Sequence, residues 1–254
     1  MSDVGVEIDH ATHVATIEIR RGPNNYFDID VLARLADEMT EVARRDARAI
    51  VLCSEGKHFC AGADFSGAAG RVGREGGPHL YDVAIRLFEQ PLPIVAAVQG
   101  AAIGGGLGLA LAADFRVAAG EARFAANFSQ LGFHPGFGLT VTLPRVVGQQ
   151  AALDLLYTGR RLDGAEAHRI GLCDHLVTGE EVRGRATDLA AEIAAAAPLA
   201  VRSIRQTMRG SLAADVRAAM AHERAEQERL QQSDDFREGV AAVGERRAAR
   251  FTGR

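Results

Sequence analysis

Hydrophobic and polar residues alternate along the first part of the chain in the manner of half-buried strands. Residues 14–19 alternate apolar with polar positions, and the apolar positions of residues 6–8 can pair with them across a polar turn at residues 9–12. Two later runs, Ala49–Cys53 and Ile94–Val98, are apolar throughout, which is typical of strands buried on both faces. The pattern therefore predicts a hairpin and at least two fully buried strands.

Helical spacing appears between these strands and dominates the last part of the chain. The segment after the first loop carries apolar residues at helical spacing, namely Val31, Leu35, Met39 and Val42. Either Asp28 or Asp30 can cap this helix. A further helix is expected near Tyr81–Glu89, and short strands are expected at 115–118 and 123–125. From residue 179 onward the pattern predicts only helices, at 180–197, 198–208, 213–232 and 237–250. Alternating strands and helices indicate an α/β layered core with a helical C-terminal region.

Composition and charge exclude several classes of function. A chain of 254 residues with 47% hydrophobic content can bury a sizeable core, and its net charge of -4 without a basic stripe gives no reason to expect a nucleic-acid partner. Residues 94–113 are long enough to span a membrane, but they consist largely of alanine and glycine and are flanked by Pro93 and Asp114. We therefore expect a strand, a tight turn and a buried helix there, and no membrane partner.

The three cysteines, Cys53, Cys60 and Cys173, indicate neither a disulfide framework nor a metal site. They are odd in number and form no CxxC pair, and His58 with Cys60 is a lone HxC. Residues 1–10 lack the basic region and apolar stretch of a secretory signal. We expect a reducing, cytoplasmic location and no bound metal.

Two glycine-bearing loops are the strongest candidates for chemistry. GKHFCAGADF at 56–65 and QGAAIGGGLGLAL at 99–111 each follow a predicted strand. Backbone N–H groups at a strand-to-helix junction are unpaired, and small residues let a ligand approach them, so the two loops can form an oxyanion hole. The dinucleotide pattern GxGxxG and the P-loop pattern are both incomplete here. The alternative interpretation is close packing between helix and strand.

Several motifs in the same order resemble one family. GKHFCAGADF is followed by PLPIVAAVQGAAIGGGLGLALAADFRVA, by LGFHPGFGLTVTLPRVVG and by TGRRLDGAEAHRIGLCDHLV. This series is similar to the crotonase superfamily, also called the enoyl-CoA hydratase/isomerase family, over nearly the whole chain. The resemblance implies ββα turns wound into a spiral core at 1–195. It also implies a C-terminal helical region at 196–254 that joins subunits into a homotrimer or a dimer of trimers.

The resemblance also implies an acyl-CoA thioester as substrate, with coenzyme A as part of that substrate and no separate cofactor. The backbone N–H groups of Ala63 and Gly105 are expected to hold the thioester oxygen as an enolate forms. The remaining residues expected along the coenzyme A or the acyl group are His58, Phe59, Cys60, Ala61, Asp64, Gly104, Gly108, Phe128, Arg250 and Phe251. Tyr26, His79 and Tyr81 are further candidates for the acyl pocket.

The sequence departs from the family pattern at the acids. Family hydratases carry glutamates where this chain has Gly108 and Phe128, and some family isomerases carry an acid where it has Gly136. We expect an empty volume at Gly108, where a carboxylate would project. His134 can serve as a general base at neutral pH, with a packed or surface histidine as the alternative.

Two hypotheses follow from the missing acids. In the first, the protein is an atypical enzyme that stabilises an acyl-CoA enolate and catalyses a reaction other than ordinary hydration, such as decarboxylation, C–C cleavage or isomerisation. Hydration needs both a base for the water and an acid for the α-carbon. In the second, the chain is a non-catalytic acyl-CoA binder or a partner subunit in a lipid pathway.

Overall fold

The computed structural model describes residues 2–63 and 78–254. Its larger sheet has six strands in the order β1-β2-β3-β4-β6-β9. These strands are β1 Val4–Asp9, β2 Val14–Ile19, β3 Ala49–Ser54, β4 Ile94–Val98, β6 Phe115–Ala119 and β9 His175–Val177. β1 and β2 form the predicted antiparallel hairpin, and every later neighbour in this sheet pairs in parallel. β3 and β4 are buried at every residue, as their apolar runs predicted.

A smaller sheet makes the fold a spiral. It has the strand order β5-β7-β8, with β5 Ala101–Ile103, β7 Arg123–Ala125 and β8 Arg161–Asp163. The chain passes from β4 in the larger sheet to β5 in the smaller one and returns through the next helix to β6, after which β7 again joins the smaller sheet. This repeated turn confirms the predicted crotonase-like ββα core.

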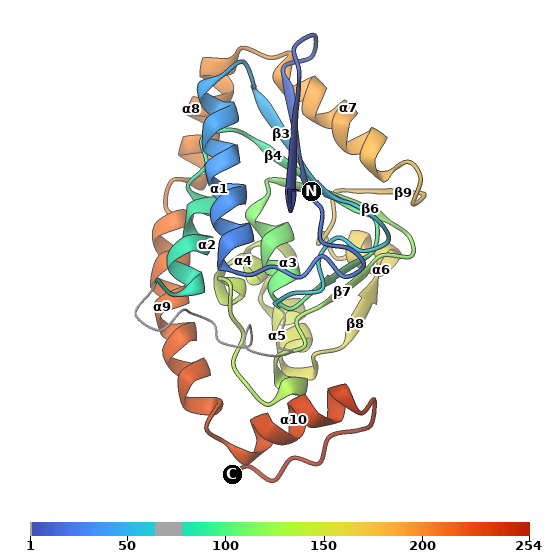
Figure 1. The fold of residues 1–254 in the computed structure, drawn as a ribbon, viewed down its shortest axis with the longest axis vertical. Helices are drawn as coiled ribbons and strands as arrows, with labels where there is room; N and C mark the ends of the chain where they lie inside the picture. The colour runs from blue at the N-terminus through green and yellow to red at the C-terminus, as the bar shows by residue number, and fades with distance from the viewer. Residues whose placement is uncertain (1, 64–77) are drawn as a thin grey trace.

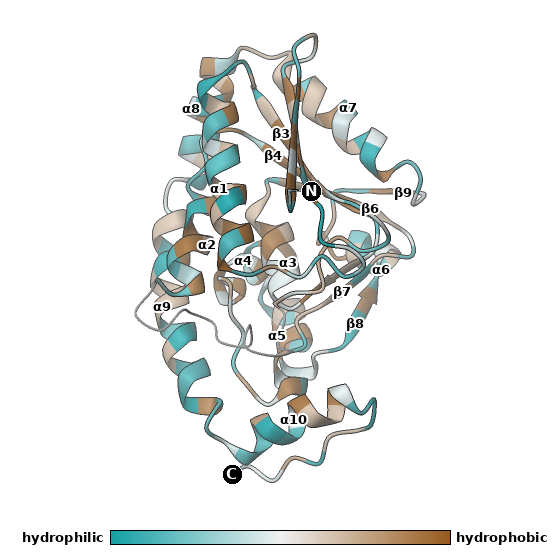
Figure 2. Ribbon diagram, viewed as in Figure 1, coloured by the Kyte–Doolittle hydropathy of each residue, from teal (hydrophilic) through white to brown (hydrophobic). Residues whose placement is uncertain are grey.

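Helices cover both faces of the larger sheet. The helices of the described residues are α1 Ile29–Arg44, α2 Leu80–Phe88, α3 Gly105–Ala112, α4 Leu139–Val147, α5 Gln149–Thr158, α6 Gly164–Arg169, α7 Val182–Ala194, α8 Pro198–Arg209, α9 Leu212–Leu230 and α10 Asp234–Gly244, with a short 3₁₀ helix, η2, at Ser129–Leu131. α7 packs on β3, β4 and β6, whereas α1 packs on β1, β2 and α2 from the other side (Figure 1). Hydrophobic residues gather in the strands between these helices (Figure 2).

The α1 prediction is confirmed in detail, and the prediction for the last helix is wrong at both ends. Asp28 caps α1 by accepting a hydrogen bond from the Val31 N–H at 2.9 Å. The helix predicted at 237–250 is α10, which begins three residues earlier because the Ser233 hydroxyl caps it, and ends at Gly244. Arg246 then has a φ of 55°, so the chain cannot continue as a helix.

No elements were predicted between residues 139 and 177, where the structure has α4, α5, β8, α6 and β9.

The predicted division at 195/196 falls between α7 and α8. α9 packs against α2 and α4, and α10 packs against η2, so the C-terminal helices are joined to the core. Within the described ranges, no helix combines the length and the apolar composition that crossing a membrane requires.

Helix α8 is attached to the core through charge rather than through apolar packing. The Asp114 carboxylate accepts hydrogen bonds from Arg205 Nε at 2.9 Å and from Arg209 Nη1 at 2.6 Å, and its Oδ2 also accepts the Ile94 N–H at the start of β4. Burial lowers the pKa of Arg205, and the Asp114 charge opposes that shift. The outward side of α8 instead carries Ile204 and Met208, with exposed fractions of 63% and 80%. The usual pattern of an amphipathic helix is therefore reversed in α8.

Replacing Asp114 is expected to release α8. An Asp114→Asn variant removes the charge that two largely buried guanidinium groups share, which we expect to lower the free energy of unfolding by about 3 kcal/mol. Asp188→Asn, an exposed position in α7, is the matched control and is expected to change stability by less than about 0.5 kcal/mol. Urea denaturation of both variants measures the difference. Equal unfolding midpoints for the two would contradict the role given to Asp114.

Candidate active site

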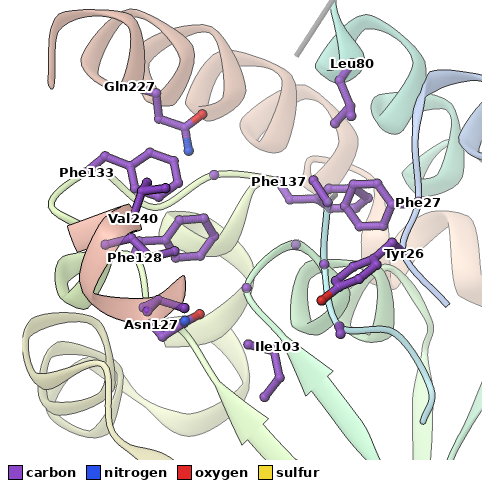
Figure 3. A pocket seen from close by; sticks show the side chains of 18 of the residues that line it. Tyr26, Phe27, Leu80, Ile103, Asn127, Phe128, Phe133, Phe137, Gln227 and Val240 are labelled. Atoms are coloured by element: carbon purple, nitrogen blue, oxygen red, sulfur yellow. The ribbon is translucent and has the colours of Figure 1, made fainter. Parts of the chain in front are cut away.

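A cavity of about 560 Å³ lies where the two glycine loops meet the C-terminal helices (Figure 3). Both sequence regions on either side of residue 195 contribute to its wall. Its described lining residues include Tyr26, Phe27, Ala61, Gly62, Ala63, Tyr81, Gly104, Gly105, Asn127, Phe128, Phe133, Gly136, Phe137, Arg161, Gln227, Phe236 and Val240. The site is therefore part of the core fold and of the C-terminal helices at once.

The two glycine loops are held together by backbone hydrogen bonds. Cys60 donates its N–H to the Ala101 carbonyl at 2.8 Å, and Ile103 donates its N–H to the Cys60 carbonyl at 3.1 Å. On the other side of the first loop, the Phe27 N–H donates to the Gly62 carbonyl at 3.1 Å. The first loop thus runs as an extra strand beside β5. This pairing fixes the spacing between the backbones of the two loops.

Ala63 and Gly105 both line the cavity with free backbone donors. Within the described part of the chain, neither N–H donates to a backbone or side-chain acceptor. Gly105 is the first residue of α3, so its N–H is one of those that a helix leaves without an internal partner. A Cβ atom at Gly62, next to Ala63, would lie 3.7 Å from the Gly105 nitrogen. The structure therefore brings the two predicted donor loops into contact.

At each position of the triplet Gly104 to Gly106, a separate physical constraint requires glycine. Gly104 has a φ of 56°, a left-handed conformation that favours glycine. A Cβ atom at Gly105 would lie 2.5 Å from Cζ of Phe27, and one at Gly106 would overlap the carbonyl oxygen of Cys60. The close-packing interpretation is thus confirmed. The same glycines also expose the backbone to the cavity, and the oxyanion hole stays a prediction.

Comparison with known proteins identifies the family. A family model described as enoyl-CoA hydratase/isomerase matches residues 9–254. The chain belongs to this family, within the crotonase superfamily. A crystal structure of an enoyl-CoA hydratase/isomerase from Pseudoalteromonas atlantica T6c matches with a TM-score of 0.88 and 31% identity, covering 99% of this chain and 100% of that chain.

Two curated relatives show the range of the family. The 1,2-epoxyphenylacetyl-CoA isomerase of Escherichia coli strain K12 is 32% identical over 250 residues, which cover 95% of this chain and 95% of that protein. The mitochondrial methylglutaconyl-CoA hydratase of Homo sapiens is 34% identical over 233 residues, which cover 89% of this chain and 68% of that protein. Family membership therefore includes both hydratase and isomerase relatives.

The prediction of an empty volume at Gly108 is wrong. Gly108 is buried in α3, and a Cβ atom there would lie 2.7 Å from Cβ and 2.8 Å from Cδ1 of Phe137. The Phe137 ring, itself buried, occupies the space into which the first family glutamate would project. Gly108 is absent from the described cavity wall, which Phe137 forms instead. Gly108 is thus a packing glycine covered by an aromatic ring.

The other two acid positions are also occupied by packed side chains. Phe128 lines the cavity and packs edge-on against Phe133, with 5.4 Å between ring centroids. At Gly136, a Cβ atom would overlap the Tyr81 hydroxyl, which donates a hydrogen bond of 2.8 Å to Gln227 Oε1. Burial, reinforced by the nearby charge of Glu223, raises the pKa of Tyr81, so this phenol stays protonated. Among the described lining residues there is no carboxylate and no imidazole.

The structure places His134 away from the cavity wall. Its Nδ1 lies 2.8 Å from the Pro135 carbonyl, and its ring packs edge-on against His222 at 5.7 Å between centroids. Its backbone carbonyl accepts a hydrogen bond of 2.8 Å from Nε2 of Gln227, which itself lines the cavity. The described cavity wall does not include His134. These contacts fit the alternative of a packed histidine, and a general base at His134 stays a prediction.

The expected coenzyme A contacts are only partly at the cavity. The cavity is lined by Ala61, Gly104 and Phe128. In contrast, Phe59 and Cys60 are buried in the core. Burial raises the pKa of the Cys60 thiol to about 12, which excludes a reactive thiolate at neutral pH. His58 Nδ1 accepts the Ala101 N–H at 3.3 Å and so supports the second loop. Asp64 lies outside the described residues.

The C-terminal residues Arg250 and Phe251 are not at this cavity in the described structure. Arg250 donates its N–H to Glu238 at 2.7 Å, and Phe251 is 45% exposed. Both belong to a tail that folds back on α10, the helix whose Val240 reaches the cavity wall. Their predicted contact with coenzyme A stays a prediction.

Several contributors to the site, Phe27 and Phe137 among them, were not found from the sequence. Gln227 links Tyr81 to the loop at His134, and Phe133 and Phe236 complete the cavity wall. Gln227 has no motif around it, and its burial in α9 could not be read from a charged helix. Tyr26 and Tyr81 line the cavity as expected, but His79 caps α2 instead, by accepting the Tyr81 N–H at 3.1 Å.

The contact between Gly108 and Phe137 can be tested by a double-mutant cycle. Gly108→Ala is expected to destabilise the protein by about 1–3 kcal/mol because the ring must move, although alanine is the better helix former. In a Phe137→Ala background the same change is expected to cost nothing or to stabilise, since the obstacle is gone. Urea denaturation of the four proteins gives the coupling energy. Additive effects would contradict the assigned contact.

Proposed function

We propose that this family member binds an acyl-CoA thioester and stabilises its enolate with the backbone N–H groups of Ala63 and Gly105. The observation that carries the proposal is a cavity with two free backbone donors and no carboxylate or imidazole among its described lining residues. Fixed donors at a developing oxyanion contribute about 3–4 kcal/mol each in measured cases. The thioester named for the Escherichia coli and human relatives supports this substrate class.

The same cavity favours chemistry other than ordinary hydration. Hydration needs a general base and a general acid, whereas the described polar side chains of the wall are Tyr26, Tyr81, Asn127, Arg161 and Gln227. Decarboxylation of a 2-carboxyacyl-CoA requires the fewest catalytic groups from such a site. The bond to the carboxylate breaks, carbon dioxide leaves, and the electron pair passes into the thioester as an enolate. Water then supplies the proton to the α-carbon. Isomerisation and C–C cleavage require an additional proton transfer.

A non-catalytic acyl-CoA binder is the second candidate. The lack of acid and base groups in the described wall, together with tight ring packing over Gly108, favours it equally. It differs from the first candidate in one measurable property, since it forms a complex and releases no product.

Binding and turnover separate the candidates. We expect an acyl-CoA to bind about 10- to 30-fold more tightly than the corresponding S-alkyl-CoA thioether, because the thioether lacks the oxygen that two N–H groups would bind. Isothermal titration calorimetry measures both. Incubation with malonyl-CoA in D₂O is expected to give acetyl-CoA carrying deuterium at the α-carbon, with no hydration of crotonyl-CoA.

Each result of that experiment has a defined meaning. Equal affinity for thioester and thioether would contradict the oxyanion hole. Tight thioester binding without product from malonyl-CoA or from β-keto thioesters would favour the binder. Rapid hydration of crotonyl-CoA would show that the described wall lacks a group the reaction uses.

The reversed pattern of α8 supports assembly with further copies of this chain. Its arginines face the core at Asp114, while Ile204 and Met208 lie on its exposed side. We propose that this side packs against a second copy in a homotrimer or a dimer of trimers, because apolar side chains gain by leaving water.

Light scattering after size-exclusion chromatography tests the assembly. Ile204→Glu is expected to lower the mass to that of a single chain, because a charge is buried in the contact. Gln206→Glu, at an exposed position on another side of the same helix, is the matched control and is expected to keep the wild-type mass. A wild-type protein that elutes as a monomer would contradict the proposal.

A further inference from the structure

The aromatic residues of the chain are concentrated at the cavity. The sequence has eleven phenylalanines and three tyrosines, and seven of these fourteen rings belong to the described cavity wall. They are Tyr26, Phe27, Tyr81, Phe128, Phe133, Phe137 and Phe236. Aromatic residues make up only 6% of the chain, so the composition of the wall differs from that of the protein as a whole.

The rings form two groups on opposite sides of the cavity. We define the first wall as Phe128, Phe133 and Phe236, which pack edge-on with centroids 5.4 Å and 5.3 Å apart. The second wall is Phe27 and Phe137, whose centroids are 5.3 Å apart. Figure 3 shows Phe128 and Phe133 on one side of the open space and Phe27 and Phe137 on the other. A ligand in the cavity therefore has ring surfaces on two sides.

Both walls are fixed to the backbone that carries the proposed donors. The Phe27 ring lies against Gly105, and the Phe137 ring lies against Gly108 three residues further along α3. From the first wall, Cζ of Phe128 would lie 3.8 Å from a Cβ atom at Gly104. The rings are thus held in place beside the glycine triplet. An acyl group attached to a thioester at Gly105 would extend between the two walls.

We propose that the acyl group of the substrate is a planar arene, as in a phenylacetyl or benzoyl thioester. The inference rests on the proposed function, because it takes the thioester to be held at Ala63 and Gly105. An arene offers its faces and edges to the rings of both walls, and such pairs are stabilised beyond the burial of their area. A saturated acyl group of the same size gains the burial alone. The two aromatic walls are therefore expected to favour an arene over a saturated acyl group of the same size.

The test compares thioesters that differ only in the ring. We expect phenylacetyl-CoA to bind about tenfold more tightly than cyclohexylacetyl-CoA, and more tightly than hexanoyl-CoA, in isothermal titration calorimetry. Phe133→Leu is expected to remove most of this preference while changing the affinity for cyclohexylacetyl-CoA by less than about threefold. Tyr157→Leu removes an aromatic ring that is 74% exposed on α5 and is the matched control, which is expected to keep the full preference.

The outcomes separate this inference from the proposed function. If cyclohexylacetyl-CoA or hexanoyl-CoA binds as tightly as phenylacetyl-CoA or more tightly, the inference of an arene is wrong, and the proposed binding of a thioester still holds. Binding of none of the three thioesters overturns the proposed function itself. If Phe133→Leu fails to fold, Phe128→Leu in the same wall takes its place. A preference that survives in the folded variants of both positions overturns the role of the first wall.

Discussion

The close contact between two backbone segments is the constraint on which the rest of the site depends. The loop at Cys60 lies against the N-terminus of α3 so tightly that only glycine fits at Gly106, facing the Cys60 carbonyl. Backbone hydrogen bonds on both sides of the contact, to Ala101 and from Ile103, hold it in place. Because the loop pairs with β5 while α3 leads back to β6, this single contact also joins the smaller sheet to the larger one.

Once that contact is set, the side chains around it decide what the donors can do. Phe27 covers Gly105 from one side, and Phe137 fills the space beside Gly108. At Gly136 the space belongs to the hydrogen-bonded pair of Tyr81 and Gln227. Each position where the family resemblance implies an acid is therefore closed by packing. Low polarity in such a wall raises the free energy of any carboxylate placed there.

Local patterns predicted the strands β1 to β4, β6 and β7, together with α1 and the two glycine loops, because each depends on residues close together in the sequence. β3 and β4 follow from their apolar runs, and the Asp28 cap follows from its place before a helical repeat. The contact of Gly108 with Phe137 joins residues that no periodicity connects, so a missing side chain was taken for a missing volume. The surroundings of His134 could not be read from the sequence for a related reason, since the His222 ring that packs against it comes from a different segment.

The missing acids and the aromatic walls are two aspects of one feature. A ring stands at Phe128 in place of one acid that the resemblance implies, and the ring of Phe137 occupies the space of another. The same two rings also line the cavity. Restoring a glutamate at Gly108 alone would oppose a buried ring, because the ring cannot leave without opening a cavity. Ordinary hydration would thus require repacking of α3 against Phe137 as well as new carboxylates. Under the proposed function, the packing of the rings would set the specificity, and the N–H groups of Ala63 and Gly105 would stabilise the enolate.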